Sequence, residues 1–323
     1  MHFPTDINLL LDAVRKLIEL TARLCSAYGI DGWRQFGHNL NKTKKLYRRA
    51  QKLKSSNSRD EAKKAKQQEI LKAAYVSYLE VAQEFIERAQ ASITLLEQKG
   101  CCEMLQLLMI KGYIKHGQRQ IDQIKRRVLL GEVIPHSEKV FSIFEEHTEW
   151  ISKGKAGVPQ ELGLKVCIVE DQYRFILHHR VMERETDDQI AVSITQEAKQ
   201  RFADLNSCSY DKGFHNATNR GELETLLDRV VLPKKGKLSQ LDKEREHSPE
   251  FMQARRRHSG VESAINAVEN HGLDRCLDHG MEGFKRYVAL AVVARNMQVL
   301  GRILQQKELK RLKKRQRHYR LAA

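Results

Sequence analysis

The sequence predicts a helix-rich α/β protein in which a mixed sheet is covered by helices. The first 130 residues carry apolar residues at helical spacing, and the next hundred contain short segments rich in β-branched and aromatic residues. Composition agrees, because 30% of the 323 residues are charged and only five are prolines. The alternation of strand-like and helical segments after residue 131 is typical of a sheet with covering helices.

The N-terminal part is predicted to be all-helical. Residues 6–28 have apolar residues at helical spacing, with Asp6 as the expected N-cap, and the segment "GIDGWRQFG" ends the pattern. Gly100 is expected to end the longest of the later helices. These later helices are predicted over residues 38–54, 59–98 and 101–130.

Beyond Gly131 the pattern changes to short alternating segments. "EKVFSIFEEHT" is predicted as a short strand, and "LGLKVCIV" and "RFILHHRVM", separated by "EDQY", as a hairpin. Then follow a helix that Asp187 and Asp188 are expected to cap, a strand in "LNSCSYDKGF", a helix in "NATNRGELETLL" and a strand in "DRVVLPKKGK". From residue 249 to the end the chain is predicted to be helical.

The cysteines and the apolar runs predict a cytoplasmic protein. None of the six cysteines forms a C-x-x-C pair, so buried reduced thiols are expected rather than a zinc site or disulfides. No uninterrupted apolar run approaches the roughly 20 residues that span a bilayer. The N-terminus has no basic region before its apolar stretch, which argues against a signal peptide. We therefore expect no membrane partner.

The positive charge predicts a polyanionic partner. The formal net charge is +16, and residues 42–72 hold twelve Lys or Arg against three acids. The C-terminal "KELKRLKKRQRHYR" holds eight against one. Solvated helix faces are the alternative for either stretch alone, but both together favour nucleic acid. Because aromatic residues do not alternate with the basic ones, contact with the phosphate backbone is expected rather than base stacking.

Two carboxylates stand where metal chemistry could use them. Asp211 follows a predicted strand, and Gly213 is expected to let the chain turn and leave room for a phosphate or metal. Glu262 lies on an expected continuous helix after a basic run, Arg255, Arg256, Arg257 and His258. Carboxylate oxygens bind Mg²⁺, which can activate a hydroxyl for attack on phosphate. An ordinary turn residue and a salt-bridged surface glutamate are the alternatives.

Around these carboxylates the chain resembles a known family. The stretches that carry the resemblance are "HFPTDINLLLDA", "SEKVFSIFEEHTEWISKGKAGVPQELGLKVCIVEDQYRFILHHRVME", "SCSYDKGFHN", "DRVVLPKKGK" and "RHSGVESAINAVENHGLDRCLDHGMEGFKRYVALAVVARNMQVLGR". In this order they resemble the DDE transposases of bacterial insertion sequences, more narrowly the ISNCY type. They cover most of residues 1–304.

The resemblance implies an RNase H-like mixed sheet that is incomplete at its first strand, with a large all-helical insertion and a helical C-terminal section. Residues 1–6 would be the remnant after the first catalytic strand, and residues 7–130 the helical insertion. Residues 131–304 would form the RNase H-like catalytic core, and residues 305–323 a basic helical tail.

The resemblance also implies roles for individual residues. Asp211 matches the second acid of the DDE triad and Glu262 the third, and in the family three carboxylates hold two Mg²⁺ ions. Such an enzyme nicks DNA at the terminal repeats of the element and joins the strands to target DNA. The residues expected to contact DNA are Arg255, Arg256, Arg257, His258, Asn266, Lys234 and Lys235. The family's tyrosine–arginine–glutamate–lysine signature is altered, with His258 and Glu269 at its Arg and Lys positions.

The first acid of the triad is the largest departure from the family. The resemblance implies that its strand lies upstream of Met1, so we expect an N-terminally truncated chain. Asp6 is the nearest substitute, although an N-cap role explains it better. Three functions stay open: a Mg²⁺-dependent transposase, a catalytically inactive DNA-binding remnant, and an unrelated basic RNA-binding protein. A homodimer or larger oligomer is also left open.

Overall fold

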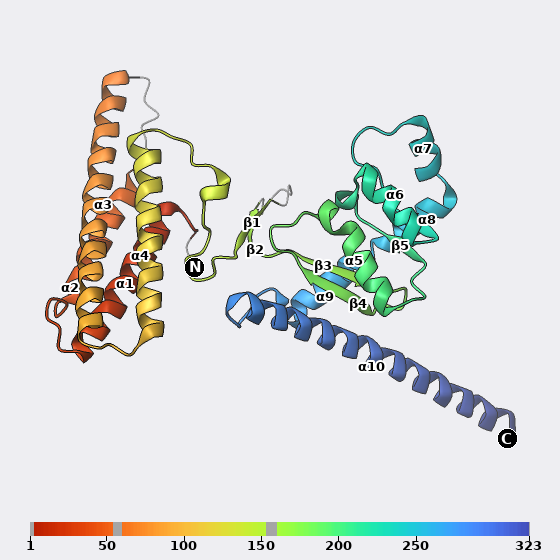
Figure 1. The fold of residues 1–323 in the computed structure, drawn as a ribbon. Helices are drawn as coiled ribbons and strands as arrows, with labels where there is room; N and C mark the ends of the chain where they lie inside the picture. The colour runs from red at the N-terminus through yellow and green to blue at the C-terminus, as the bar shows by residue number, and fades with distance from the viewer. Residues whose placement is uncertain (1–2, 54–59, 153–159, 323) are drawn as a thin grey trace. The chain divides into compact units, whose positions relative to one another are not determined.

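The computed structural model describes residues 3–53, 60–152 and 160–322, with side chains up to Gln316 (Figure 1). The chain divides into two compact units, Met1–Thr148 and Glu149–Ala323. Both are rich in helices, and the strands form only small sheets. The predicted helix-rich α/β class is therefore confirmed.

The first unit is built on four helices that lie side by side (Figure 1). They are α1 (Asp6–Ala27), α2 (Phe36–Lys52), α3 (Glu61–Gln98) and α4 (Met104–Ile124), and a π-helical turn, Lys125–Leu129, continues the last one. All four predicted helices are present. Short connections between consecutive helices give the antiparallel order that is usual in helix bundles.

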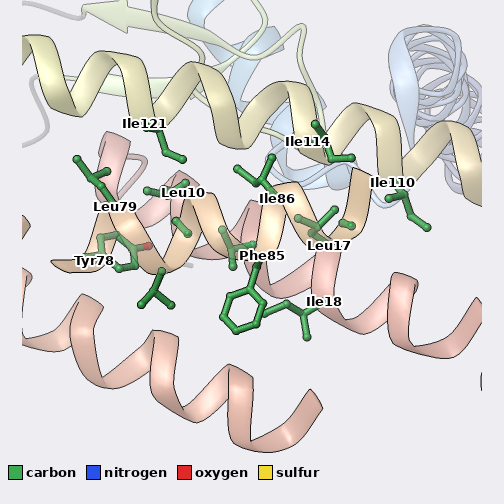
Figure 2. Packing of buried hydrophobic residues seen from close by; sticks show 14 of the residues in the cluster. Leu10, Leu17, Ile18, Tyr78, Leu79, Phe85, Ile86, Ile110, Ile114 and Ile121 are labelled. Carbon is green, nitrogen blue, oxygen red and sulfur yellow. The ribbon is translucent and has the colours of Figure 1, made fainter. Parts of the chain in front are cut away.

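The core of this bundle is a continuous stack of aliphatic and aromatic side chains (Figure 2). Tyr78 and Phe85 of α3 are seven residues apart and therefore share a face, as do Leu10 and Leu17 of α1. All four side chains are at most 1% exposed. Burying each such side chain contributes about 1.5–3 kcal/mol, so the helical spacing in the sequence is also the main source of stability.

Residues 138–148, predicted to contain a strand, form turns instead. The hydroxyl oxygen of Ser142 accepts hydrogen bonds from the backbone N–H groups of Phe144 (3.2 Å) and Glu145 (3.0 Å). A serine that bonds the backbone in this way competes with strand pairing. The apolar residue Ile143 packs against Leu9 of α1 rather than into a sheet.

The second unit contains three two-stranded sheets among its described residues. Strands β1 (Glu149–Ser152) and β2 (Gln160–Gly163) pair antiparallel, as do β3 (Val166–Glu170) and β4 (Ile176–Val181). Strands β5 (Ser207–Ser209) and β6 (Arg229–Val231) pair in parallel. The predicted hairpin and the two later strands are confirmed, but they do not join into one hydrogen-bonded mixed sheet.

Helix α5 (Asp187–Arg201) packs against side chains associated with both the β3–β4 and the β5–β6 pair. Ile190 and Ile194 pack with Met182, next to β4, while Ala191 packs against Tyr210, next to β5. The N-cap of α5 is Thr186, which forms a capping box with Gln189. The expected caps, Asp187 and Asp188, are instead the first two residues inside the helix.

The remaining elements are helical, as predicted from residue 249 onward. They are α6 (Ala217–Leu226), α7 (Gln240–Glu246), α8 (Pro249–His258), α9 (Val261–Val268) and α10 (Gly280–Ala322). The continuous helix expected through Glu262 is interrupted at Ser259 and Gly260, between α8 and α9. The guanidinium of Arg174, from the β3–β4 turn, occupies the space beside Gly260 where a Cβ atom would stand.

Helix α10 closes the second unit against β4. Val292 and Ala291 pack with Ile176 of β4 and Val268 of α9. The side-chain amide of Asn296 accepts a hydrogen bond from the N–H of Ile176 (2.8 Å) and donates one to its carbonyl (2.9 Å). These bonds satisfy backbone groups that a neighbouring strand would otherwise pair.

Among the described residues, Gly280–Gln316 is the one segment long and apolar enough to cross a membrane by length and composition, and 28% of its apolar window is buried in the structure. Polar residues such as Arg295 interrupt this stretch, so no uninterrupted apolar run is visible in the sequence.

Replacing Leu17 by alanine should destabilise the first unit by about 2–5 kcal/mol, because the fully buried side chain leaves a cavity. Leu105→Ala on α4 is the matched control: that side chain is 73% exposed, and we expect a change within about 0.5 kcal/mol. Urea unfolding followed by Trp33 fluorescence, in a Trp150→Phe background, measures both. Equal losses in the two variants would contradict the assignment of the core.

Candidate functional site

Asp211 lies where strand β5 ends. The ladder continues one residue past β5, because the N–H of Tyr210 donates to the carbonyl of Val231 (3.0 Å). The Tyr210 ring is buried, and its hydroxyl shares a 2.7 Å hydrogen bond with the hydroxyl of Thr195 on α5. Asp211 then starts a 3-10 turn, Lys212–Phe214. Its side chain is 77% exposed, so the carboxylate is presented to solvent from a backbone that is anchored on both sides.

His258, the last residue of α8, connects that helix to β5. Its Nδ1 lies 2.9 Å from the hydroxyl oxygen of Ser209, and its Nε2 lies 3.1 Å from Oδ1 of Asp211. The hydrogen bond to His258 lowers the pKa of Asp211. A lowered pKa stabilises the fold above the ordinary pKa of the carboxyl group, and this contribution is lost as pH falls through the lowered value.

Gly213 has a different role from the predicted one. Its φ lies outside the left-handed region, so the turn itself does not require glycine. A Cβ atom at this position would stand 2.7 Å from Oδ2 of Asp187, a separation too short for real atoms. Gly213 therefore leaves room for the carboxylate of Asp187 at the start of α5.

Asp187 is a residue near this turn that the sequence analysis assigned only to helix capping. Burial raises the pKa of the Cys167 thiol on β3 to about 12, and the charges of Asp187, Cys208 and Asp211 add to the increase. The carboxylates of Asp187 and Asp211 thus both raise the pKa of the Cys167 thiol on β3, and so does Cys208 on β5. Nothing in the spacing of these residues along the sequence indicates that they are close together.

The helix that ends in His258 carries three exposed basic side chains. Arg255, Arg256 and Arg257 are exposed on α8, and no carboxylate within the described residues lies within ion-pair distance of them. Met252, Arg255, Arg256 and Ser259 line a shallow open hollow. The expected nucleic-acid contacts on α8 are therefore accessible and uncompensated, except for His258, which is engaged with Asp211.

Glu262 lies in the first turn of α9, four residues after His258, and is exposed. No hydrogen bond or ion pair joins it to Asp211 in the part of the chain that the structure describes. Asn266, one turn further on, is exposed and accepts a 3.2 Å hydrogen bond from the side chain of Asn270. Both residues thus lie on the exposed side of α9. No hydrogen bond or ion pair among the described residues holds the side chain of Glu262.

The two carboxylates do not make a complete magnesium site. The described residues contain no group of three or more His, Cys, Asp or Glu side chains placed to hold a metal ion. Mg²⁺ prefers oxygen ligands in octahedral geometry, and Asp211 and Glu262 are the two oxygen ligands expected here. The residues present therefore do not by themselves fit the two ions that the family resemblance implies.

The loop after β6 contains Lys234 and Lys235, both expected to contact DNA. Nζ of Lys234 pairs with Oδ2 of the buried Asp242 (2.5 Å), and its backbone N–H donates to Glu246 (2.7 Å). The contact with Lys234 lowers the pKa of Asp242. Lys234 is therefore an ion-pair partner within the protein, whereas Lys235 is exposed. The pKa of Asp188 is lowered mainly by a hydrogen bond with Thr186, and the charge of Lys235 adds a smaller contribution.

Asp6, the expected substitute for the first acid, is engaged elsewhere. It is the first residue of α1, and Thr5 is the N-cap, so the predicted capping role is wrong. Its two carboxylate oxygens accept hydrogen bonds from Arg127, 2.7 Å from Nε and 3.0 Å from Nη2. This bidentate pair uses the groups that a metal ion would need.

The first unit carries a second basic surface. The buried residues of α2 are Thr43, Tyr47 and Ala50, so its basic residues emerge on the opposite side. The exposed basic residues are Lys42, Lys45, Arg48, Arg49 and Lys52. Of these, Lys42 lies 3.5 Å from Glu84. Helix α2 itself contains no acidic residue, so its exposed side is positively charged. The two interpretations of this charge are contact with a polyanion and simple exposure of a helix face to water.

Comparisons with known proteins add no relative. No family model, no curated protein and no solved structure matches the chain.

Gly213→Ala should destabilise the second unit, because the new methyl group must displace the carboxylate of Asp187. Gly221→Ala is the matched control: it lies within α6 with no atom within 4 Å of an added Cβ, and alanine should stabilise that helix by about 0.5–1 kcal/mol. Thermal unfolding by circular dichroism compares the two variants. Equal midpoints would rule out the close approach of Asp187.

His258→Ala should raise the pKa of Asp211 toward the ordinary aspartate value, because the carboxylate loses its hydrogen bond. Titration of the Asp211 carboxyl carbon by NMR measures this directly. His247→Ala, at the end of α7, removes a histidine that makes no contact with Asp211 and should leave its pKa unchanged. An unchanged pKa in His258→Ala would contradict the bridge.

Proposed function

We propose that the chain binds DNA as a protein of the DDE-transposase type, with α8 holding the phosphate backbone next to Asp211. One observation carries the proposal: the helix that presents Arg255, Arg256 and Arg257 ends in His258, which hydrogen-bonds Asp211. A phosphate held by these arginines would therefore lie on the helix whose last residue contacts Asp211. This is the juxtaposition that cleavage of a phosphodiester requires.

The charges support phosphate as the ligand. Guanidinium groups bind phosphate with two parallel hydrogen bonds, and the three arginines of α8 have no competing carboxylate among the described residues. A net charge of +16 adds long-range attraction for a polyanion. The exposed side chains of α8 include no aromatic ring to stack on a base. Contact with the backbone of duplex DNA is therefore favoured over recognition of unpaired bases in RNA.

The arrangement of the small sheets supports an RNase H-like core that is incomplete at its first strand. Ile190 of α5 packs with Met182, next to β4, and Ala191 of α5 packs with Tyr210, next to β5. Cys208 and Asp211 also raise the pKa of Cys167 on β3. Strands β3 and β5 are thus near each other, yet no ladder hydrogen bond joins them among the described residues. One extended strand between them would complete a mixed sheet of a hairpin and parallel strands.

Catalysis is the second part of the proposal. Asp211 and Glu262 would be the second and third acids, and DNA nicking and strand transfer would need a first acid to complete the metal site. Because the described residues lack a three-ligand group, binding without cleavage is the favoured activity of the chain as described. We assign this protein to the cytoplasm, where DNA is accessible and its six free cysteines stay reduced.

Replacing Arg255, Arg256 and Arg257 together by alanine should weaken binding to duplex DNA and reduce the slope of log K against log salt by up to about 3. Fluorescence anisotropy with two unrelated duplexes, over a range of salt concentrations, measures both quantities. Because the contacts are to phosphates, the loss should be similar for the two sequences.

A matched control removes the same charge from another helix. Lys111, Lys115 and Arg119 of α4 are changed to alanine, and binding should fall less than in the α8 variant. Equal losses would show that net charge alone binds DNA and would contradict a specific role for α8. Nicking of supercoiled plasmid with Mg²⁺ that disappears in Asp211→Asn would identify a complete enzyme, whereas binding without nicking identifies the binding-only form.

A further inference from the structure

Helix α10 is apolar on two opposite faces. One face packs inside the second unit through Val288, Ala291, Val292 and Val299, all at most 7% exposed. The other face lies outside and carries a row of exposed apolar side chains. This row, which we call the outer seam, consists of Leu290 (67% exposed), Val293 (53%), Met297 (68%), Leu300 (48%) and Leu304 (55%).

The spacing of the outer seam is that of a coiled coil. Successive members are separated by three, four, three and four residues, which is the a/d repeat of a heptad. On an α-helix this repeat forms one narrow stripe, suited to a single partner helix. Two small residues, Ala294 and Gly301, flank the stripe and would let a second helix approach closely.

The seam is short and bounded. The heptad positions before Leu290 are Arg286 and Gly283, and those after Leu304 are Lys307 and Arg311. The apolar stripe therefore covers two heptads, near the middle of the 43-residue helix. Figure 1 shows α10 as one uninterrupted helix over this length, so the seam is presented on a straight, regular support.

We propose that the outer seam pairs with the outer seam of a second copy of this chain, in antiparallel orientation. In that alignment Leu290 faces Leu300 of the second copy and Val293 faces its Met297. A two-fold axis repeats both contacts, so one short stripe supplies four apolar layers. This proposal stands independently of DNA binding.

Charge selects the antiparallel orientation. A parallel pair would bring together two tails, each with the exposed basic residues Lys307, Lys310, Arg311, Lys313, Lys314 and Arg315. An antiparallel pair separates the tails to opposite ends. It also places Lys310 alongside Glu282 of the second copy, whose carboxylate is 78% exposed. Attraction between Lys310 and Glu282 at both ends of the antiparallel pair thus replaces the repulsion between two basic tails at one end of a parallel pair.

The area fits a weak dimer. Four side chains of each copy, Leu290, Val293, Met297 and Leu300, meet in this alignment, and at roughly 100 Å² each they bury about 800 Å² in total, the size of a weak or transient interface. A membrane is the competing partner, because this segment meets the length and composition of a span. Spanning would require removing Arg295 and the packed valines from the second unit. A surface-bound helix would bury a wide apolar face rather than a single heptad stripe.

The test measures mass in solution. At high salt, with nucleic acid removed, light scattering or sedimentation over a range of concentrations should show a dimer of the 37.4 kDa chain. Met297→Lys combined with Leu300→Lys should weaken the dimer at least about tenfold, because charges enter the centre of the seam. Both side chains are already exposed in the single chain, so the variant should fold normally, as circular dichroism would verify.

The matched control is Leu309→Lys. Leu309 is 51% exposed on the same helix but lies off the seam, so the dimer should persist. Glu282→Lys should weaken the dimer, and adding Lys310→Glu should restore it if the helices are antiparallel. A monomeric wild-type chain at all concentrations would overturn the proposal, as would equal weakening by Leu309→Lys. Failure of the charge exchange to restore pairing would overturn the antiparallel orientation.

Anionic and neutral phosphatidylcholine-based vesicles are the probes for the competing partner. If the wild-type chain is monomeric and sediments with vesicles, and Met297→Lys with Leu300→Lys abolishes that binding, the seam is a membrane contact and the dimer is excluded. A dimer that leaves vesicles unbound supports the proposal.

Discussion

The bridge that His258 makes between Ser209 and Asp211 is the interaction on which the candidate site depends. It joins the end of α8 to the end of β5, so the helix that carries the exposed arginines contacts a carboxylate some fifty residues away in the sequence. The same contact lowers the pKa of Asp211.

The interruption between α8 and α9 serves the same arrangement. Arg174, at the tip of the β3–β4 hairpin, occupies the space that a side chain at Gly260 would need, and it pairs with the buried Glu170. The tip of the hairpin therefore lies against the break between α8 and α9. Helix α5 packs beside both the β3–β4 and the β5–β6 pair, whose edges are not joined to each other within the described part of the chain.

The helices were predictable because each buries one face, and a repeat of 3.6 residues is visible in the order of apolar residues. The hairpin was predictable from its β-branched segments. The strand expected before residue 148 failed because Ser142 bonds the backbone locally. The capping role expected of Asp6 belongs instead to its neighbour Thr5. The ion pairs of Asp6 with Arg127 and of Lys234 with Asp242 were not predicted, because the partners are distant in the sequence or separated by a turn.

The sequence by itself determined the helical first unit, the strong positive charge, and the positions of Asp211 at a strand end and of Glu262 after a basic run. These depend on local periodicity and composition. Only the tertiary structure decided that His258 binds Asp211, that Gly213 accommodates Asp187, and that one face of α10 is buried while the outer seam is exposed. Contacts between distant segments depend on how helices and strands pack, and this information is not contained in the spacing of residues along the chain.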